Sequence, residues 1–358
     1  MAAFVDRLSS LPDEILHHVL SHTQAKEAAA SSVLSRRWRT LWLQAGVLNL
    51  DTRRFGTADD SYDAFVRGAN AALAPFRGAG GPVLRRVTIF MGRSCRRNRY
   101  SYNNDSDDDD DRDDLVNAIL ADPATARLEE LHVDYEDNMM FSNAGSTVRL
   151  AFLRCAATLR TLELSNCGVK ACGGGLGFPR LSSLVLRNCV LPEGYLQDVV
   201  DAAPALSSLR LQDVRHEPVP TETEKEERKK RYCWERKCYL LRFGLRCPTL
   251  TELVLVACGT VRKKEAALSY SGIELDVPNL QSFSYRGRSV RLALTLPMPN
   301  LARVDIDDSG RSGYGRDRYR CSYSYGDDED RGPKKLVPLS SMIESFRCWR
   351  YAQETIRI

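Results

Sequence analysis

Two hydrophobic patterns follow one another along the 358 residues of this chain. In residues 6–46 the apolar positions recur at the spacing of amphipathic helices. From residue 84 onward, short Leu-x-Leu segments alternate apolar and polar positions, as strands with one buried face do. The patterns predict an α/β chain with a small helical module at the N-terminus and a larger domain of repeated short strands.

The first helix of the module is predicted to begin at Pro12, because proline has no N–H that would be left unpaired in the first turn. Asp13 and Glu14 follow, and carboxylates at this place face the positive end of the helix dipole. The apolar residues of this segment fall on one stripe, which consists of Leu11, Ile15, Leu16, Val19 and Leu20.

Two further helical segments complete the module. Residues 26–33 are rich in alanine, and Trp38, Leu41 and Trp42 then fall at positions i, i+3 and i+4 of one helix face. Aromatic residues and arginines are enriched at the energetic centres of protein–protein interfaces. The arginines beside this face are Arg36, Arg37 and Arg39. A segment this short and this apolar on one side is typical of a docking module for a partner protein.

The run from Leu11 to Leu16 and the later run from Leu34 to Trp42 together resemble an F-box of the kind abundant in plants. The similarity covers residues 6–46, with both halves in the family's order and spacing. It implies a three-helix module that binds a Skp-type adaptor within a cullin-RING ubiquitin ligase. Transferred position by position, it places the adaptor contacts at Leu11, Pro12, Ile15, Leu16, Val19, Leu20, Val33, Leu34, Trp38 and Trp42.

One segment departs from the pattern of that family. The family usually has an apolar residue and a proline after the first helix, where this chain has His22-Thr23-Gln24. The departure is expected to weaken the packing between the first two helices, and it leaves the adaptor affinity open. An ordinary helical cap on a larger domain is the alternative interpretation, because stripes at helical spacing also occur in cores.

The rest of the chain repeats the unit Leu-x-x-Leu-x-Leu-x-x-Cys. The unit is clearest from Leu159 to Cys167, from Leu181 to Cys189 and from Leu250 to Cys258. Further copies begin at Leu84, Leu128, Leu206, Leu280 and Leu301. Most successive starts lie ~20–29 residues apart, which is the period of leucine-rich repeats.

Residues 83–310 therefore resemble a leucine-rich-repeat array. One unit cannot bury its own apolar face, so the units are expected to stack into a solenoid with a curved parallel sheet. Helical segments such as residues 194–203 would return the chain on the convex side. The motif cysteines are interpreted as packed thiols in the repeat turns rather than as metal ligands.

The expected domain order is an F-box at residues 1–50, a connecting helix and linker at 51–82, and the repeat solenoid at 83–332. The connecting helix would place Phe65, Ala69, Leu73 and Phe76 on one side. Residues 333–358 are expected to form a C-terminal cap or tail. Polar insertions, predicted to be loops or disordered, interrupt the solenoid at 93–114, 217–237 and 307–331.

Composition limits the partners and the compartment. The net charge of +4 is small for this length and does not favour nucleic acid as a partner. The N-terminus lacks a signal-peptide pattern, and no run of 18 apolar residues would span a membrane. The 11 scattered cysteines fit a reducing compartment. The expected location is the nucleus and/or the cytoplasm, with residues 228–231 forming either a nuclear-import patch or a solvated loop.

The sequence shows no motif for catalysis, for a cofactor or for a metal. The glycine-rich residues 173–177 do not fit a phosphate-binding loop, and Cys233, Cys238 and Cys247 lack the paired spacing of zinc ligands. No enzymatic activity and no cofactor are therefore expected.

The two resemblances together imply the substrate-recognition subunit of a Skp–cullin–F-box ubiquitin ligase. The repeats would bind a target protein through exposed strand residues, for which Glu163, Val185, Arg210 and Val254 are the candidates. Two alternatives remain: a leucine-rich-repeat scaffold with an idle F-box, and an enzyme or small-molecule receptor with a ligand in the hollow of the solenoid.

Overall fold

The computed structural model describes residue 8 and residues 10–55, 61–78, 80–92, 115–136, 147–170, 175–217, 243–258, 272–287, 291–307 and 356–357. The chain forms two compact units. Unit 1 comprises residues 1–136, 143–167 and 172–180, and unit 2 comprises residues 137–142, 168–171 and 181–358. The predicted polar insertions and the C-terminal cap or tail lie outside the described residues, except for Glu217, Asp307 and residues 356–357.

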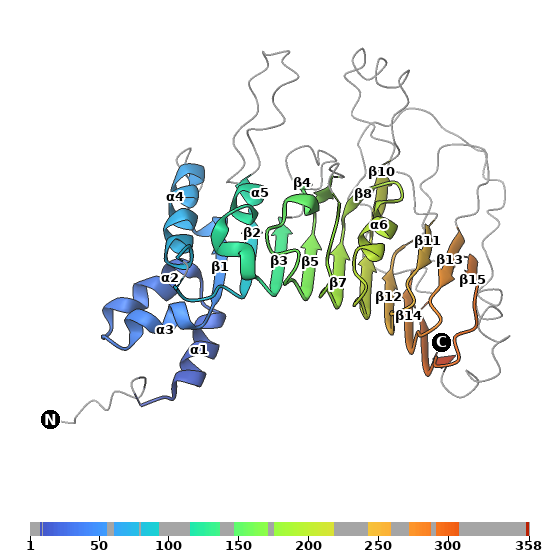
Figure 1. Ribbon diagram of the computed structural model, residues 1–358, viewed down its shortest axis with the longest axis horizontal. Coiled ribbons are helices and arrows are strands. Elements are labelled where there is room, and N and C mark those ends of the chain that lie inside the picture. Colours follow the sequence, from blue (N-terminus) through green and yellow to red (C-terminus); the bar gives the residue numbers. More distant parts are fainter. Residues whose placement is uncertain are drawn as a thin grey trace, which may run out of the picture. The chain divides into compact units, whose positions relative to one another are not determined.

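Short helices open unit 1 (Figure 1), as the sequence predicts. They are α1 (Asp13–Ser21), α2 (Ala25–Ala30), the 3-10 turn η1 (Ser31–Val33) and α3 (Trp38–Gln44). Pro12 is the N-cap of α1, so the helix begins one residue after the predicted start, a difference within the usual ambiguity of helix ends. Leu16 and Leu20 of α1 are buried, as are Trp38 and Trp42 of α3, so the two helices share a small core.

The helical module continues directly into a sheet. After α3, Gly46 adopts a left-handed φ of +64°, and strand β1 (Val47–Asp51) begins at the next residue. β1 pairs in parallel with β2 (Arg86–Met91), with Leu48 beside Val87. Residues 47–50, the end of the segment predicted as the F-box, form part of β1 because Leu48-Asn49-Leu50 carries the same alternation as the repeats.

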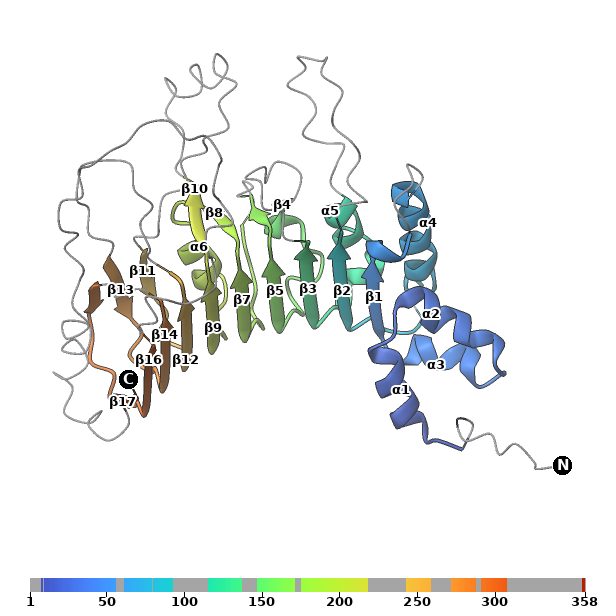
Figure 2. The ribbon, with the colours of Figure 1, turned by 180° about the vertical axis from the view of Figure 1, so that it is seen from behind.

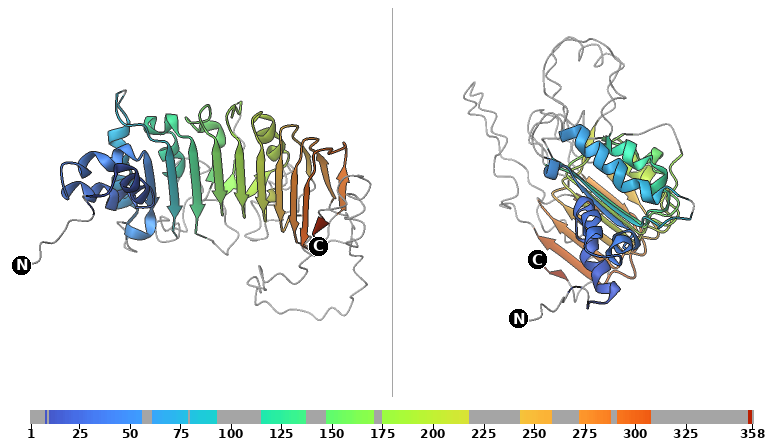
Figure 3. Two further views of the ribbon diagram at one scale, coloured as in Figure 1. Left: turned by 90° about the horizontal axis from the view of Figure 1, so that it is seen from below. Right: turned by 90° about the vertical axis from the view of Figure 1, so that its left-hand side faces the viewer.

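The predicted connecting helix is confirmed. It consists of α4 (Ser61–Leu73) and η3 (Ala74–Phe76), and a separate 3-10 turn, η2 (Thr52–Phe55), follows β1. Its predicted apolar side is buried, namely Phe65, Ala69, Leu73 and Phe76. In Figure 3, α4 and α5 (Leu115–Leu120) lie on the same side of the strands of unit 1.

The sheet of unit 1 has the order β1-β2-β3-β5 with parallel pairing throughout. The strands predicted at Leu84, Leu128 and Leu159 are β2, β3 (Glu130–Tyr135) and β5 (Thr161–Ser165). Their motif residues are in register and buried, so that Val87, Leu131 and Leu162 form one row. The connecting segments contain α5, η6 (Pro123–Arg127), β4 (Thr147–Val148) and η8 (Leu150–Phe152).

Unit 2 contains the other predicted strands (Figure 2). Its main parallel sheet comprises β7 (Ser183–Arg187), β9 (Ser208–Gln212), β12 (Glu252–Val256), β14 (Ser282–Arg286), β16 (Arg303–Asp307) and β17 (Ile356–Arg357). The first five correspond to the predicted starts at Leu181, Leu206, Leu250, Leu280 and Leu301. The repeat register is therefore confirmed across unit 2.

The returning segments of unit 2 differ in part from the prediction. The predicted helix at 194–203 is confirmed as α6 (Tyr195–Asp201). The next returning segments are strands instead of helices: β11 (Phe243–Arg246), β13 (Gly272–Asp276) and β15 (Arg291–Leu294). Ile273-Glu274-Leu275 alternates apolar and polar residues, which suits a strand and not a helix. A further small sheet contains β6 (Gly168–Val169), β8 (Val190–Pro192) and β10 (Arg215–Glu217).

None of the described helices combines the length and the apolarity that crossing a bilayer requires.

A left-handed residue ends several of the repeat strands. Among the described residues, those with positive φ outside glycine are Asn166, Asn188, Asp213 and Ala257, and each stands immediately before the last position of the repeat motif. The backbone N–H of Ala257 donates to the carbonyl of Arg286 on the next strand, at 2.7 Å. Asn and Asp adopt this conformation more readily than alanine does.

The position after the left-handed residue is buried, as the packed-thiol interpretation predicts. Cys167, Cys189 and Cys258 are free thiols without exposed surface. The thiol of Cys258 lies 3.5 Å from the carbonyl oxygens of Leu211 and Val256, to which it donates. Burial raises the pKa of Cys258 to about 12, so this thiol stays protonated at neutral pH.

Replacing Ala257 by asparagine is expected to stabilise unit 2 by about 1 kcal/mol, because asparagine tolerates the left-handed conformation that alanine resists. Urea unfolding followed by circular dichroism would measure the change. Asn188→Ala is the matched reverse substitution and should destabilise unit 2 by a similar amount. A loss of stability in Ala257→Asn would contradict the strain argument.

Candidate functional site: exposed surfaces of the two units

The helical module leaves several large hydrophobic side chains in contact with solvent. Ile15 and Val19 of α1 are 49% and 51% exposed, and Val33 and Leu34 at the end of η1 are 85% and 60% exposed. Leu8 is exposed as well, although the F-box resemblance does not mark it as a contact. Several large apolar side chains exposed on one short module are typical of a surface that a partner covers.

Arg37 ties the segment after η1 to the start of α1. Its guanidinium donates to the carbonyl oxygen of Leu11 at 2.7 Å and to the carboxylate of Asp13 at 2.8 Å. Leu11 is half-buried and Pro12 is exposed. We call the six solvent-facing members of the predicted contact set the docking residues: Leu11, Pro12, Ile15, Val19, Val33 and Leu34.

The other four predicted contact residues lie inside the chain. Leu16, Leu20, Trp38 and Trp42 are all buried, and the most exposed of them, Trp42, is 8% exposed. In this conformation they hold α1 and α3 together and do not offer a side chain to a partner. The predicted stripe on α1 therefore covers two helix faces, with Leu16 and Leu20 directed inward and Ile15 and Val19 outward.

Hydrogen bonds join the segment 22–24, which departs from the family pattern, to strand β1. The side-chain amide of Asn49 in β1 donates to the carbonyl oxygen of Thr23 at 2.8 Å. The amide of Gln24 donates to the carboxylate of Asp51 at 2.9 Å. The expected weak packing at this segment is thus compensated by hydrogen bonds that tie the turn after α1 to β1.

Asp51 is a buried carboxylate at the end of β1. Burial acts to raise its pKa, but the hydrogen bonds and the positive charge of Arg53, together with the amide of Gln24, outweigh burial and hold the pKa below its ordinary value. The guanidinium of Arg53 also lies over the ring of Phe90 at 3.9 Å. The ionised carboxylate therefore belongs to a structural cluster at the end of the first strands.

The predicted target-binding residue of unit 1 lies on the solvent-facing side of its sheet. Glu163 is half-buried and stands beside His132 in the parallel register. One carboxylate oxygen of Glu163 is 3.1 Å from Nδ1 of His132. A partner that approaches this position would meet the pair.

Unit 2 brings the other three predicted target-binding residues together. Arg210 on β9 stands between Val185 on β7 and Val254 on β12 in the parallel register. No ion pair joins the exposed Arg210 to another residue in the described part of the chain. The row therefore presents an arginine between two aliphatic side chains.

Two arginines further along the same sheet are neutralised within the chain. Arg286 pairs with Asp307 at 3.0 Å, and Arg303 pairs with Asp305 at 2.5 Å. Motif spacing alone could have shown which residues share a row. It could not have shown which arginines are already paired.

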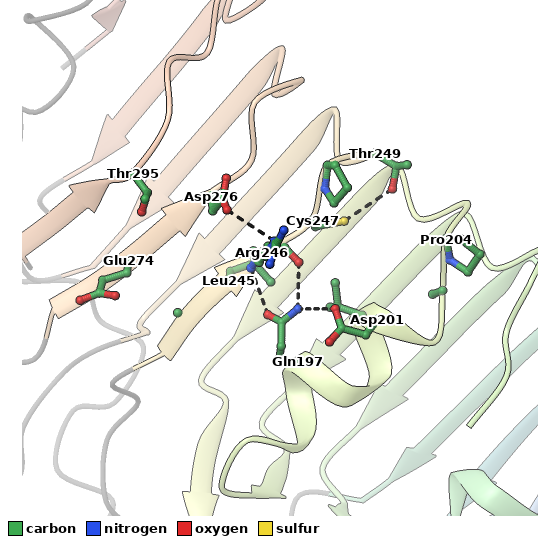
Figure 4. A pocket seen from close by; sticks show the side chains of 14 residues that line it. Gln197, Asp201, Pro204, Leu245, Arg246, Cys247, Thr249, Glu274, Asp276 and Thr295 are labelled. Carbon is green, nitrogen blue, oxygen red and sulfur yellow. Dashed lines mark hydrogen bonds and ion pairs between the residues drawn. The ribbon is translucent and has the colours of Figure 1, made fainter. Parts of the chain in front are cut away.

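Unit 2 also contains a cleft of about 690 Å³ between α6 and the sheet of β11, β13 and β15 (Figure 4). Side chains of Gln197, Asp201, Arg246, Glu274 and Asp276 line it. No sequence motif marked this site. Among the described residues, no group of three or more His, Cys, Asp or Glu side chains could hold a metal ion.

Comparison with known protein families finds matches to two family models. The F-box domain family matches residues 8–48, and the family described as "FBD-associated F-box protein At5g56370, LRR repeats" matches residues 116–267. The two matches cover the helical module and most of the repeat strands.

Similar proteins come from Arabidopsis thaliana. F-box/FBD/LRR-repeat protein At2g04230 is 27% identical over 223 residues, which is 59% of this chain and 48% of that protein. F-box/LRR-repeat protein At5g02910 is 52% identical over 50 residues, or 14% of this chain and 11% of that protein. The chain thus spans at most about half the length of these curated relatives. It combines an F-box domain with leucine-rich repeats, and both are of the kinds found in plant F-box/LRR-repeat proteins.

Proposed function

We propose that the chain is the substrate-recognition subunit of a Skp–cullin–F-box ubiquitin ligase. The F-box binds a Skp-type adaptor, and the adaptor connects it to the cullin-RING ligase. The exposure of Ile15, Val19, Val33 and Leu34 within the matched F-box residues carries this proposal. A partner that covers these side chains removes apolar surface from water, at roughly 25 cal/mol per Å².

In this proposal the chain contributes proximity and no catalytic step of its own. Holding a target lysine near a charged ubiquitin raises the effective concentration of the two reacting groups. The ligase partners perform the transfer itself. The proposed site of action is the nucleus and/or the cytoplasm.

The target surface proposed for unit 2 is the row of Val185, Arg210 and Val254. An arginine flanked by aliphatic groups offers a fork of donors and apolar contact area together. In unit 1, Glu163 is the proposed position for target contact.

The test is capture of a purified Skp-type adaptor by the full chain. The double variant Val19→Lys/Val33→Lys should bind the adaptor at least about 100-fold more weakly, because lysines replace two exposed apolar contacts. Lysine has at least the helix propensity of valine, so the fold should persist. Trp38→Ala is a poor choice for this test, since Trp38 is buried and its loss would also destabilise the module.

The matched control is Phe152→Lys, which alters an exposed apolar side chain of unit 1 outside the F-box match. It should leave adaptor binding within about twofold. If the folded wild-type chain captures no adaptor, the F-box is idle and a leucine-rich-repeat scaffold becomes the better interpretation.

A further inference from the structure

Strand β11 has one edge that no strand of the described chain occupies. It pairs with β13 on one side, in the sheet order β11-β13-β15. Helix α6 contacts β11 at Arg246, through Gln197, and lines the cleft together with the strand. Unpaired strand edges are the usual places where an extended peptide adds to a sheet.

At one end of this edge, the side chain of Gln197 makes the hydrogen bonds that a neighbouring strand would make. The side-chain carbonyl of Gln197 accepts from the backbone N–H of Arg246 at 3.0 Å, and its amide donates to the carbonyl of Arg246 at 2.9 Å (Figure 4). A carboxamide is chemically a peptide group. The backbone of Arg246 therefore already makes, with Gln197, the two hydrogen bonds that a neighbouring strand would make there.

Gly244 offers the same pair of backbone groups two residues earlier. Alternate residues of a strand direct their N–H and C=O groups to the same side, so those of Gly244 face the way those of Arg246 do. Gly244 is exposed and lines the cleft. A methyl group built on it would meet no atom within 4 Å, so the sheet face at Gly244 is open.

The net negative charge of the cleft lining favours a basic partner. Asp201, Glu274 and Asp276 line it, and Arg246 is the one basic residue among the described lining residues. Arg246 lies 3.6 Å from Asp276 and neutralises that carboxylate. The amide of Gln197 donates to Asp201, and Glu274 is exposed. The lining keeps an excess of two negative charges, which favours lysine or arginine side chains on an incoming strand.

We propose that this cleft binds an extended, basic peptide segment of a partner protein, which adds as a strand to the edge of β11 at Gly244. Backbone hydrogen bonds would supply the affinity, and Glu274 and Asp201 would select basic side chains at alternate positions. This site is separate from the docking residues and from the row of Arg210, and it does not depend on adaptor binding.

The experiment uses the full chain and a fluorescein-labelled hexapeptide in which Lys alternates with Val. Fluorescence anisotropy should show saturable binding that weakens as salt is raised. The variant Gly244→Pro should bind at least tenfold more weakly, because proline lacks the N–H while edge strands tolerate it. Glu274→Lys should also weaken binding at least fivefold, through the reversed charge.

The control Glu193→Lys makes the same charge reversal at an exposed residue outside the cleft, and binding should stay within twofold. Glu274→Lys keeps the test valid if Gly244→Pro unfolds. The proposal is overturned by absence of binding to the wild type, by equal binding of a peptide with Glu in place of Lys, or by unchanged binding in a folded Gly244→Pro. It is also overturned if Gly244→Pro instead dissolves a dimer seen in size-exclusion chromatography, since a second copy would then be the occupant.

Discussion

Replacing Trp42 by alanine is expected to lower the free energy of unfolding of unit 1 by about 4 kcal/mol. Trp42 is 8% exposed, and its ring meets the ring of Phe76 edge to face, with the centroids 6.1 Å apart. The indole thus joins α3 to the end of the connecting helix, and alanine would leave a cavity there. Urea unfolding followed by circular dichroism at 222 nm would measure the loss.

A double-mutant cycle separates the ring contact from the general effect of burial. Trp42→Leu and Phe76→Leu, alone and together, should reveal a coupling energy of about 1 kcal/mol for the edge-to-face pair. A loss below 1 kcal/mol in Trp42→Ala would contradict the buried position. It would mean that the indole is free to contact an adaptor directly, as the F-box resemblance implies.

Spacing was sufficient to predict the repeat strands because the motif and the structure share one period. In Leu162-x-Leu164 the two leucines must face one side of a strand, and parallel stacking then sets them beside Leu131 and Val133. The burial of the turn cysteines could be predicted in the same way, from their fixed position at the end of the motif. Each residue of the motif specifies a local geometry that its neighbours in the stack repeat.

In the helical module, residue spacing alone does not distinguish buried from exposed apolar positions. Ile15 and Leu16 are adjacent in one apolar stripe, yet Ile15 is half exposed and Leu16 is fully buried. A stripe wider than one helix face contains both core and surface positions, and only the packing of α3 against α1 separates them. The predicted contact set therefore mixes exposed residues with buried residues that support them.

Contacts between residues far apart in the chain could not be predicted from the sequence motifs. The cleft joins Gln197 to Arg246, 49 residues further along the chain, and neither residue belongs to a motif. The returning strands β11, β13 and β15 pair with one another in parallel. The alternation of Ile273-Glu274-Leu275 favours a strand locally, but the pairing between repeats is not specified by the motif of any single repeat.

The turn at Gly46 is the second position where one substitution should have a large effect. Gly46 has a φ of +64°, and a methyl group added to it would lie 2.7 Å from the carbonyl oxygen of Val83. A left-handed alanine costs roughly 1–2 kcal/mol, and forced overpacking costs roughly 1–3 kcal/mol. Gly46→Ala is therefore expected to destabilise unit 1 by about 3 kcal/mol in urea unfolding.

The matched control is Gly177→Ala in the same unit, where a methyl group would meet nothing within 4 Å. Its stability should change by less than about 0.5 kcal/mol. The carbonyl of Gly46 also accepts from the N–H groups of Arg85 and Arg86, at 2.8 and 3.1 Å, so the turn connects the F-box to β2. A shift of the Gly46 backbone disturbs both sides of this connection. Adaptor capture and the unfolding midpoint should therefore fall together in Gly46→Ala, whereas a neutral result would show that the F-box is held to the sheet by other contacts.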